Sequence, residues 1–286
     1  MSASRVLLIA AVLAAGCTRE PAQPPPPTPE QLAAYRQQLF AELKPVKLTD
    51  CEFVRIGEAT DGGYVMCRNL MARARSLYSY GINGNDNWGC SMSGMLKVPV
   101  HQYDCFNPKR PLCDLPDARI TFHDECVGPE RKTEDGRPFD TMASQFERNG
   151  DAGKTLIVKM DVEGSEWPSF LSAPDSVLNQ IDQLSVEFHG VDRPEYTESI
   201  RKLKRIFHVV NVHYNNWVCD TSAAPFPSTA FEVLFVNRNI ATVDPAGVPP
   251  IPNPLDFRNN FPEPDCQLPP EAYGYPPQTP AQPKSR

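Results

Sequence analysis

The strongest constraint on the fold of this chain is a series of short apolar runs separated by segments with helical spacing. The runs span residues 76–81, 98–104, 118–123, 155–161, 183–189, 208–214 and 231–237. Helix-compatible segments fall between most of them, at 87–97, 139–149, 165–180 and 195–206. Strands that alternate with helices predict an α/β fold with a mostly parallel sheet covered on both faces. The last two runs have no clear helix between them, which predicts an antiparallel edge.

Two further elements precede the first of these runs. Residues 30–43 carry leucine and tyrosine side chains at helical spacing, which predicts an amphipathic helix. Residues 51–67 read "CEFVRIGEATDGGYVMC", with two short apolar stretches around Asp61-Gly62-Gly63. This pattern predicts a β-hairpin. We therefore expect a helix and a hairpin ahead of the main sheet.

The N-terminus has the pattern of an export signal. Arg5 precedes the apolar run "VLLIAAVLAA", which is too short to span a bilayer and fits a signal peptide. The run ends in "LAAGC", which resembles a bacterial lipobox with Cys17 as the lipidated residue. We expect an exported protein, attached by this anchor alone to the bacterial cell envelope and facing the periplasm or exterior. An ordinary secretory signal is the alternative.

Proline divides the rest of the chain. The 31 prolines are too many for an ordinary domain of this size, and they concentrate near the two ends. Such segments favour extended, polyproline-like conformations. The predicted organisation is a signal peptide and lipobox at 1–17, a linker at 18–29, a globular domain at 30–240 and a proline-rich tail at 241–286.

Cysteine content and charge limit the classes of site. Nine cysteines less Cys17 leave eight, and an even number in an exported chain predicts disulfides. Cys51 and Cys67 flank the predicted hairpin and form a candidate pair. A zinc ribbon is not expected because no CxxC pair occurs. The net charge is −7 and no cluster of lysine and arginine is present, so a nucleic-acid partner is not expected.

Polar residues gather where the predicted strands end. These positions are 81–83, 104, 123–125, 161–163, 187–189 and 213–215. One polar strand end is commonly a helix N-cap, whereas ligands of parallel α/β sheets bind outside the carboxyl ends of the strands. A series of such ends along one edge therefore predicts a binding site.

Two of these strand ends have the pattern of a nucleotide site. Gly81 closes the first run and Gly84 follows it, a turn that a nucleotide-sized ligand can approach closely. Asp104 ends the next run about twenty residues later, where nucleotide-binding sheets place a carboxylate for ribose hydroxyls. A plain strand-to-helix turn at Gly81 and an N-cap role for Asp104 are the alternatives.

Candidate catalytic groups end the later strands. Glu187 and His189 share one strand face, and a neutral histidine can take a proton from a hydroxyl. His189 is the first candidate base and His213 the second, although a lone histidine at a strand end is more often structural. Carboxylates and a histidine on one edge could hold a divalent ion, but the spacing does not demand one and no metal is assigned.

"LIVKMDVEGSEW", followed by "QLSVEFHG", resembles the FkbM-like group of class I S-adenosylmethionine-dependent methyltransferases. "DGGYVMC", "LYSYGI" and "VHQYDCF" are similar to a related branch of methyltransferase-like proteins, some of them exported. The resemblance covers about residues 50–240. It implies a Rossmann-like, mostly parallel seven-stranded sheet with an antiparallel last strand, and S-adenosylmethionine as cofactor.

The resemblance also implies roles for single residues. Asp161 would sit at the tip of the fourth strand beside the methyl group, while Glu163 and Gly164 turn the chain into the next helix; helix capping is the alternative. His189 would be the base, with Asp161 and Glu187 orienting the substrate. The implied cofactor residues are Gly81, Ile82, Asn83, Asp104, Cys105, Phe106 and Asp161, with Asp124 or Glu125 near the adenine.

The activity implied is O-methylation of a hydroxyl on a small molecule or saccharide. A location outside the cytosol favours a different function, because S-adenosylmethionine is a cytosolic metabolite. The alternative is an exported, non-catalytic lipoprotein that uses the same fold as a binding or interaction module. The two alternatives differ in whether the chain binds this cofactor.

Overall fold

A seven-stranded sheet forms the centre of the molecule, in a computed structural model that describes residues 25–278. The strand order is β5-β4-β3-β9-β10-β12-β11. β12 runs in the opposite direction to the other six strands. This arrangement is that of a Rossmann-like class I methyltransferase sheet, so the predicted fold class is confirmed. The strands are β3 (Ser76–Tyr80), β4 (Val100–Tyr103), β5 (Ile120–His123), β9 (Leu156–Asp161), β10 (Ile181–His189), β11 (Phe207–Tyr214) and β12 (Ala230–Asn237).

The last two strands form the predicted antiparallel edge of the sheet, and the last strand, β12, is antiparallel as predicted. β12 pairs with β10 on one side and with β11 on the other, so β11 is the edge strand. The chain reaches the edge first with β11 and then returns through a loop, so that β12 fills the gap next to β10. The absence of a helix between the two strands indicated their antiparallel pairing correctly, but it gave no information on their order.

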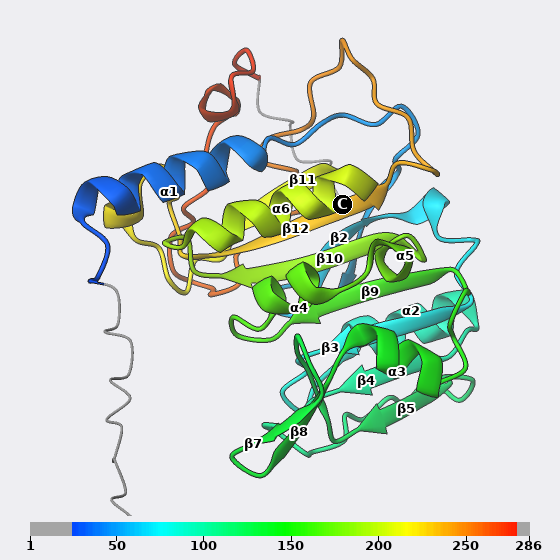
Figure 1. Ribbon diagram of the computed structural model, residues 1–286. Helices are drawn as coiled ribbons and strands as arrows, with labels where there is room; N and C mark the ends of the chain where they lie inside the picture. Colours follow the sequence, from blue (N-terminus) through cyan, green and yellow to red (C-terminus); the bar gives the residue numbers. More distant parts are fainter. Residues whose placement is uncertain (1–24, 279–286) are drawn as a thin grey trace, which may run out of the picture.

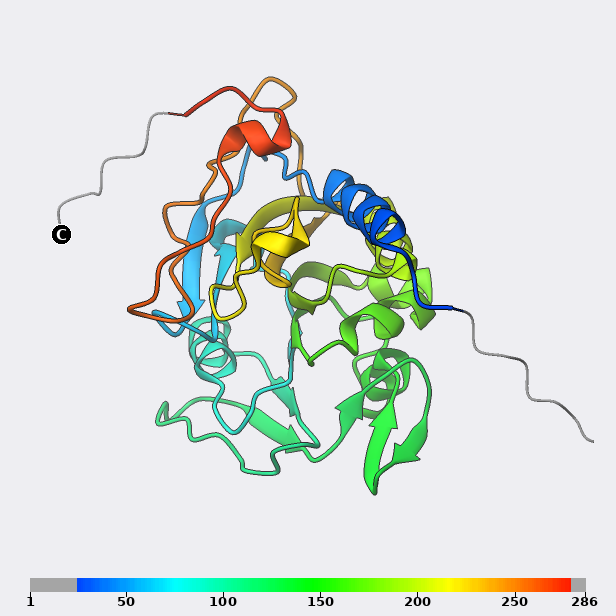
Figure 2. The ribbon, with the colours of Figure 1, turned by 90° about the vertical axis from the view of Figure 1, so that its left-hand side faces the viewer.

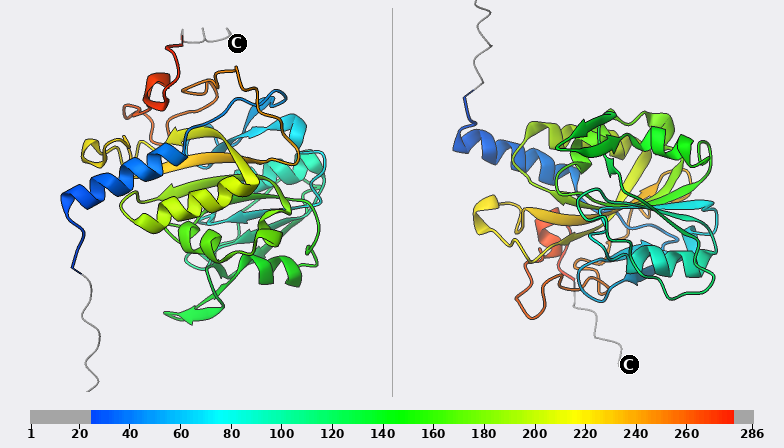
Figure 3. Two further views of the ribbon diagram at one scale, coloured as in Figure 1. Left: turned by 45° about the horizontal axis from the view of Figure 1, so that its top comes forward. Right: turned by 90° about the horizontal axis from the view of Figure 1, so that it is seen from below.

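Helices cover one face of the sheet. They are α1 (Pro29–Glu42), α3 (Met142–Arg148), α4 (Glu166–Ser172), α5 (Asp175–Leu178) and α6 (Pro194–Ile206). The right-hand view of Figure 3 shows the sheet nearly edge-on, with α1 and α6 on one side of it. α1 starts with a capping box at Thr28, and Glu42 at its other end pairs with Arg201 and Lys204 of α6 at 2.8 and 2.7 Å. These contacts hold the predicted N-terminal helix on the domain.

A single segment predicted at 165–180 forms two short helices. α4 ends at Ser172 and α5 begins at Asp175, with Pro174 between them. The residue before a proline is pushed out of the helical region, and Ala173 accordingly has an extended ψ of 129°. The break lets the chain turn back toward the start of β10 (Figure 1).

The opposite face carries α2 (Asn87–Leu96) and the predicted hairpin, β1 (Phe53–Gly57) with β2 (Gly63–Cys67). Side chains of β9 alternate between the two faces: Val158 and Met160 pack under the helices, whereas Ile157 packs beneath the hairpin and α2. Burial of both apolar faces is the main stabilising contribution to the sheet. Lys159 and Asp161 continue the face of Ile157 toward the end of the strand.

A separate three-stranded sheet was not predicted. It consists of β6 (Cys126–Val127), β7 (Lys132–Glu134) and β8 (Arg137–Asp140), and its β7–β8 hairpin projects from the domain (Figure 1). All three residues of β7 are exposed, so the segment lacks the apolar alternation by which strands are recognised. Asp135 and Gly136 turn between the strands with positive φ, and this Asp-Gly pair was the available hairpin signal.

Residues 241–278 lie against the domain instead of extending away from it as predicted. Figure 2 shows this segment, orange to red, running beside the β1–β2 hairpin. Asn259 donates to Asp61 of the hairpin at 3.2 Å, and the Tyr273 ring stacks on Phe40 with centroids 5.2 Å apart. Proline favours an extended backbone, but aromatic and asparagine side chains between the prolines supply the anchoring contacts.

Four disulfides account for all eight cysteines that follow Cys17 in the sequence. They join Cys51–Cys67, Cys90–Cys113, Cys105–Cys126 and Cys219–Cys266. The disulfide prediction and the candidate pair across the hairpin are thus confirmed. Cys17 and the predicted signal peptide lie outside the described residues, as does most of the linker. Within residues 25–278 no helix is long and apolar enough to cross a membrane.

Candidate functional site

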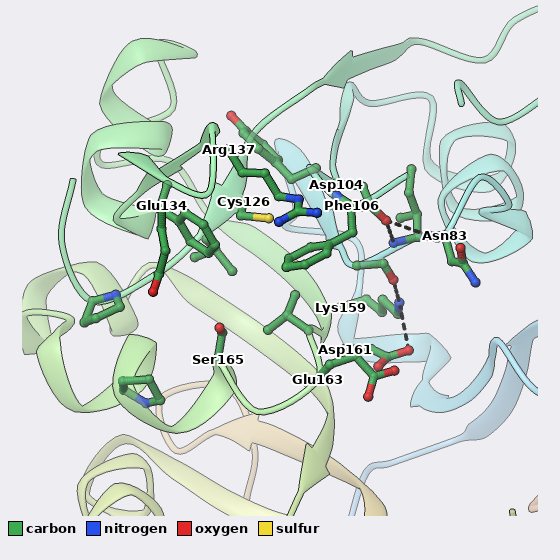
Figure 4. A pocket seen from close by; sticks show the side chains of 18 of the residues that line it. Asn83, Asp104, Phe106, Cys126, Glu134, Arg137, Lys159, Asp161, Glu163 and Ser165 are labelled. Atoms are coloured by element: carbon green, nitrogen blue, oxygen red, sulfur yellow. Dashed lines mark hydrogen bonds and ion pairs between the residues drawn. The ribbon is translucent and has the colours of Figure 1, made fainter. Parts of the chain in front are cut away.

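A cavity of about 930 Å³ opens at the carboxyl ends of β3, β4 and β9, within the size range of ligand pockets. The loops after these strands form one wall, with Asn83, Phe106 and Asp161. The β6–β8 sheet forms the facing wall, with Glu134 and Arg137 (Figure 4). The predicted site and this cavity therefore coincide.

Gly81 allows the end of β3 to touch the end of β9. Its φ is +67°, and a Cβ at this position would lie 1.5 Å from the backbone oxygen of Asp161. Only glycine fits this close approach. Lys159 fixes the junction, because its Nζ donates to the carbonyl oxygen of Gly81 at 2.6 Å and to that of Tyr80 at 3.2 Å. The turn is therefore a rigid part of the cavity wall.

Asp104 has a different task from the one predicted. Its Oδ2 accepts hydrogen bonds from the backbone N–H groups of Ile82 and Asn83, at 3.1 and 2.7 Å. Its Oδ1 accepts from those of Phe106 and Asn107, at 2.8 and 2.9 Å. A carboxylate offers about four lone-pair sites, and all are engaged. Asp104 thus ties the loops after β3 and β4 together, and the predicted ribose contact does not follow from this geometry.

The other predicted cofactor residues divide into two groups. Gly81, Ile82, Asn83, Asp104, Phe106 and Asp161 line the cavity. The Phe106 side chain is 68% exposed, and the Arg137 guanidinium lies 4.3 Å from the centre of its ring. Cys105, Asp124 and Glu125 do not line it: Cys105 is bonded to Cys126, Asp124 is exposed elsewhere, and Glu125 pairs with Arg148. The structure gives no support for an adenine contact by the last two.

The chain turns sharply after Asp161. Glu163 and Gly164 both have positive φ, +54° and +104°. Glu166, which is fully buried at the start of α4, accepts hydrogen bonds from the backbone N–H groups of Val162 at 2.6 Å and Gly164 at 2.8 Å. Sequence reasoning missed Glu166, although an acidic residue in the first turn of a helix is a recognised signal of this kind of bracing. Its carboxylate holds the turn that presents Asp161 and Glu163.

His189 lies among four carboxylates at the end of β10. Its Nδ1 is 3.1 Å from Glu166, and its Nε2 is 3.4 Å from Glu163 and 3.9 Å from both Asp161 and Glu187. Burial opposes the charged ring, but the hydrogen bond that the ring donates to Glu166 and the charges of the neighbouring carboxylates outweigh burial and raise the pKa of His189. A raised pKa favours the imidazolium, which cannot accept a proton, so the geometry does not favour the predicted base role.

A row of charged residues crosses four neighbouring strands at this level. Asp161 of β9 pairs with Glu187 of β10, Glu187 with Glu232 of β12, and Glu232 with His213 of β11. Burial, followed by the charges of Asp161 and Glu232, raises the pKa of Glu187 well above its ordinary value. His213, the second candidate base, is fully buried with its Nδ1 3.3 Å from Glu232. It therefore belongs to the interior and does not line the cavity.

No protein-family model and no curated protein sequence matches the chain. Among solved structures it is similar to an rRNA methylase from Streptococcus thermophilus, with 11% identity and a TM-score of 0.38 over 59% of this chain and 92% of that one. It is also similar to a fibrillarin pre-rRNA processing protein from Methanococcus jannaschii, with 12% identity and a TM-score of 0.36 over 67% of this chain and 84% of that one. A third similar structure is a TehB-like SAM-dependent methyltransferase from Corynebacterium glutamicum, with 11% identity and a TM-score of 0.31 over 59% of this chain and 84% of that one. The strand order defines the fold independently of these distant similarities.

Proposed function

We propose that this chain is an S-adenosylmethionine-dependent methyltransferase of the FkbM-like group that methylates a hydroxyl on a small molecule or saccharide. The observation that carries the proposal is the contact between Gly81 and Asp161 beneath the cavity. It brings a glycine turn and a strand-end carboxylate together where parallel α/β sheets bind nucleotides. The resemblance of "LIVKMDVEGSEW" to the FkbM-like pattern supports the same conclusion.

Residues of the cavity offer distinct surfaces to the parts of the cofactor. The exposed ring of Phe106, with Arg137 beside it, offers a stacking surface for the adenine. Asn83 is exposed on the glycine turn and offers an amide to the ribose or the amino-acid part. Asp161 supplies negative charge for the sulfonium: its Oδ2 faces Lys159 and Tyr64, while no donor among residues 25–278 reaches its Oδ1.

The acceptor hydroxyl would lie on the side of Asp161 that faces Glu163 and His189. S-adenosylmethionine supplies an electrophilic methyl group; the new O–CH₃ bond forms as the S–CH₃ bond breaks, and the sulfonium becomes a neutral thioether. Holding the acceptor in line contributes up to roughly 7–11 kcal/mol. The hydroxyl proton must also leave, and Asp161 Oδ1 is placed to accept it. Glu187 lies next to Asp161 in the sheet but is buried and does not line the cavity, so the predicted contact with the acceptor does not follow from this geometry.

Calorimetric titration of the oxidised, full-length chain with S-adenosylmethionine and its demethylated product tests this proposal. We expect saturable binding of both ligands. Phe106→Ala should weaken it about 5- to 150-fold, which corresponds to the loss of one aromatic–base stack. Leu112→Ala is the matched control, because Leu112 is 83% exposed in the same loop and does not line the cavity. Absence of binding by the wild-type chain would contradict the proposal.

A second function is favoured by the disulfides. Four disulfides are typical of an exported protein, and their pairing leaves only Cys17 for the lipid anchor predicted from sequence. The second candidate is therefore a non-catalytic lipoprotein on the outer side of the cell envelope, whose cavity holds a saccharide or another polar ligand. The titration above separates the two candidates, since only the methyltransferase binds the cofactor.

A further inference from the structure

Three side chains converge at the end of the cavity with the spacing of metal ligands. One atom each of Asp161, Glu163 and His189 lies within 4.8 Å of the others. His189 Nε2 is 3.4 Å from Glu163 Oε2 and 3.9 Å from Asp161 Oδ1. Two atoms bound to one ion at about 2.1 Å lie about 3.0–4.2 Å apart, depending on the angle between them. Both distances fall within this range.

The orientation of His189 is fixed from behind by a buried carboxylate. Glu166 is fully buried, and its Oε1 lies 3.1 Å from His189 Nδ1. A proton on Nδ1 satisfies this contact and leaves the lone pair of Nε2 directed at the carboxylates of Asp161 and Glu163. A lone pair facing carboxylate oxygens is repulsive unless a cation or a proton lies between them. The same carboxylate–histidine arrangement orients histidine ligands in metal sites.

A second observation is a buried carboxyl group directly behind the cluster. Glu187 is 3% exposed, and its Oε1 lies 3.9 Å from His189 Nε2. Among the described residues its hydrogen-bond donor is a neutral amide, Asn215 Nδ2 at 2.5 Å. Its partners in the sheet, Asp161 and Glu232, are also acids. A buried carboxylate requires a positive neighbour or neutralisation. Among residues 25–278 no lysine or arginine lies within ion-pair distance of Glu187, and its basic neighbour is His189.

We propose that Asp161, Glu163 and His189 bind one divalent cation, with the buried carboxyl group of Glu187 behind them. Two carboxylates and an imidazole suit Mn²⁺ better than Mg²⁺ or Ca²⁺, which prefer oxygen ligands alone. Three protein ligands leave coordination positions open. If the proposed methyl transfer is correct, an acceptor hydroxyl bound there would lose its proton more easily, because a bound cation lowers the pKa of its oxygen ligand. This last step rests on the proposed function; the cation site does not.

Titration of the tag-free, oxidised, full-length chain with Mn²⁺, followed by the electron paramagnetic resonance of free Mn²⁺, tests the site in the absence of S-adenosylmethionine. We expect one saturable site. Glu163→Gln should weaken it at least about 10-fold, and this variant should fold because Glu163 is 85% exposed. Glu134→Gln is the matched control: Glu134 is an exposed glutamate lining the same cavity outside the cluster, so its loss should leave the affinity unchanged.

Two results would overturn the proposal: no saturable binding up to about 1 mM Mn²⁺, or equal affinities of Glu163→Gln and the wild-type chain. A second readout uses the diamagnetic Zn²⁺ and the ¹⁵N resonance of His189 Nε2. The resonance should move on titration, whereas a ring that keeps its Nε2 proton at saturating Zn²⁺ contradicts ligation. Cofactor titration without metal is scored separately, so failure of the cation site and failure of the proposed function are distinguishable.

Discussion

Glu187 and Glu232 lie directly opposite each other in the antiparallel pairing of β10 with β12, and both are at least 95% buried. Like charges at such positions destabilise a sheet. Each glutamate is compensated from its other side: Glu232 by His213 at 3.3 Å and by the amide of Asn259 at 2.8 Å, Glu187 by the amide of Asn215. The row therefore has an ion pair of His213 and Glu232 in the interior, and toward Asp161 it has a glutamate whose pKa is raised.

The interior end predicts a dependence of stability on pH. Burial opposes charge on His213, but Glu232 on β12, with Asp256 and Asp265 of the C-terminal segment, raises its pKa to about 9 from an unfolded value of 6.5. A raised folded-state pKa gives stability that is complete below pH 6.5 and is lost as pH rises through about 9. We expect the wild-type free energy of unfolding to fall by about 1–3 kcal/mol more than that of His213→Gln over this window.

Urea unfolding at several pH values between 6 and 10 measures this difference. His208→Gln is the control, since His208 lies on the same strand but has its pKa lowered by burial and so titrates below the window. If the free energy of unfolding changes with pH in the same way for the wild type and His213→Gln, the ion pair of His213 with Glu232 is not the source of the pH dependence.

The bracing role of Asp104 predicts an effect on stability as well as on binding. In Asp104→Asn one oxygen becomes an NH₂ group, which faces backbone N–H donors that it cannot accept from. We expect a loss of about 1–3 kcal/mol in the free energy of unfolding, together with weaker cofactor binding. Asp114→Asn, in an exposed part of the same loop, should change neither quantity. A variant with weakened binding and unchanged stability would instead support the direct ribose contact.

The close approach at Gly81 can be separated from its backbone conformation. Gly150 has a similar positive φ, +72° against +67°, but nothing lies within 4 Å of a Cβ built there. Gly150→Ala should therefore lower the free energy of unfolding by about 1–2 kcal/mol, which is the strain of a left-handed backbone at alanine. Gly81→Ala adds a steric clash with the backbone of Asp161 and should lower the free energy of unfolding by about 1–3 kcal/mol more. Equal losses in chemical denaturation would show that the contact between β3 and β9 is not tight.

The N-terminal sequence predicts a lipid anchor. The run ending in "LAAGC" should be cleaved so that the mature chain begins at a diacylated Cys17, and Cys17→Ser should release the protein from the membrane fraction. Mass spectrometry of the mature N-terminus checks this directly. An unmodified N-terminus at another residue would favour the ordinary secretory signal.

Much of the sheet could be predicted because its strands are buried on both faces and therefore appear as apolar runs. β9 and β10 were predicted almost to their bounds, and the polar residues that follow them line or border the cavity. The same logic located Asp161 and His189, since strand ends of a parallel sheet meet at one edge.

Side-chain pairing could not be predicted in the same way. The sequence shows a carboxylate at 104 but not which N–H groups it accepts from, and in the structure four backbone donors occupy it. Glu166 was missed because the sequence motif pointed to the end of the strand. The carboxylate that stabilises the following turn instead comes from the first turn of the next helix. His189 was expected at this edge of the sheet, but its protonation depends on four carboxylates, three from residues 161–166 and one from β10.

Composition misled at the C-terminus. Proline content predicted an arm outside the domain, because proline-rich sequence seldom forms helices or central strands. In the structure, Asn259 and Tyr273 between the prolines bond to the sheet and its hairpin, so the extended backbone covers a face of the domain. The position of this segment is therefore determined by the contacts of a few side chains and not by its overall proline content.

The disulfide between Cys105 and Cys126 links the two walls of the cavity, since Cys105 precedes Phe106 and Cys126 begins the small sheet that carries Glu134 and Arg137. The width of the cavity is therefore set covalently. If this disulfide were reduced, the two walls would be held together without a covalent cross-link, by contacts such as that of Arg137 with the Phe106 ring. The redox state of Cys105 and Cys126 thus determines how firmly the binding surface keeps its shape.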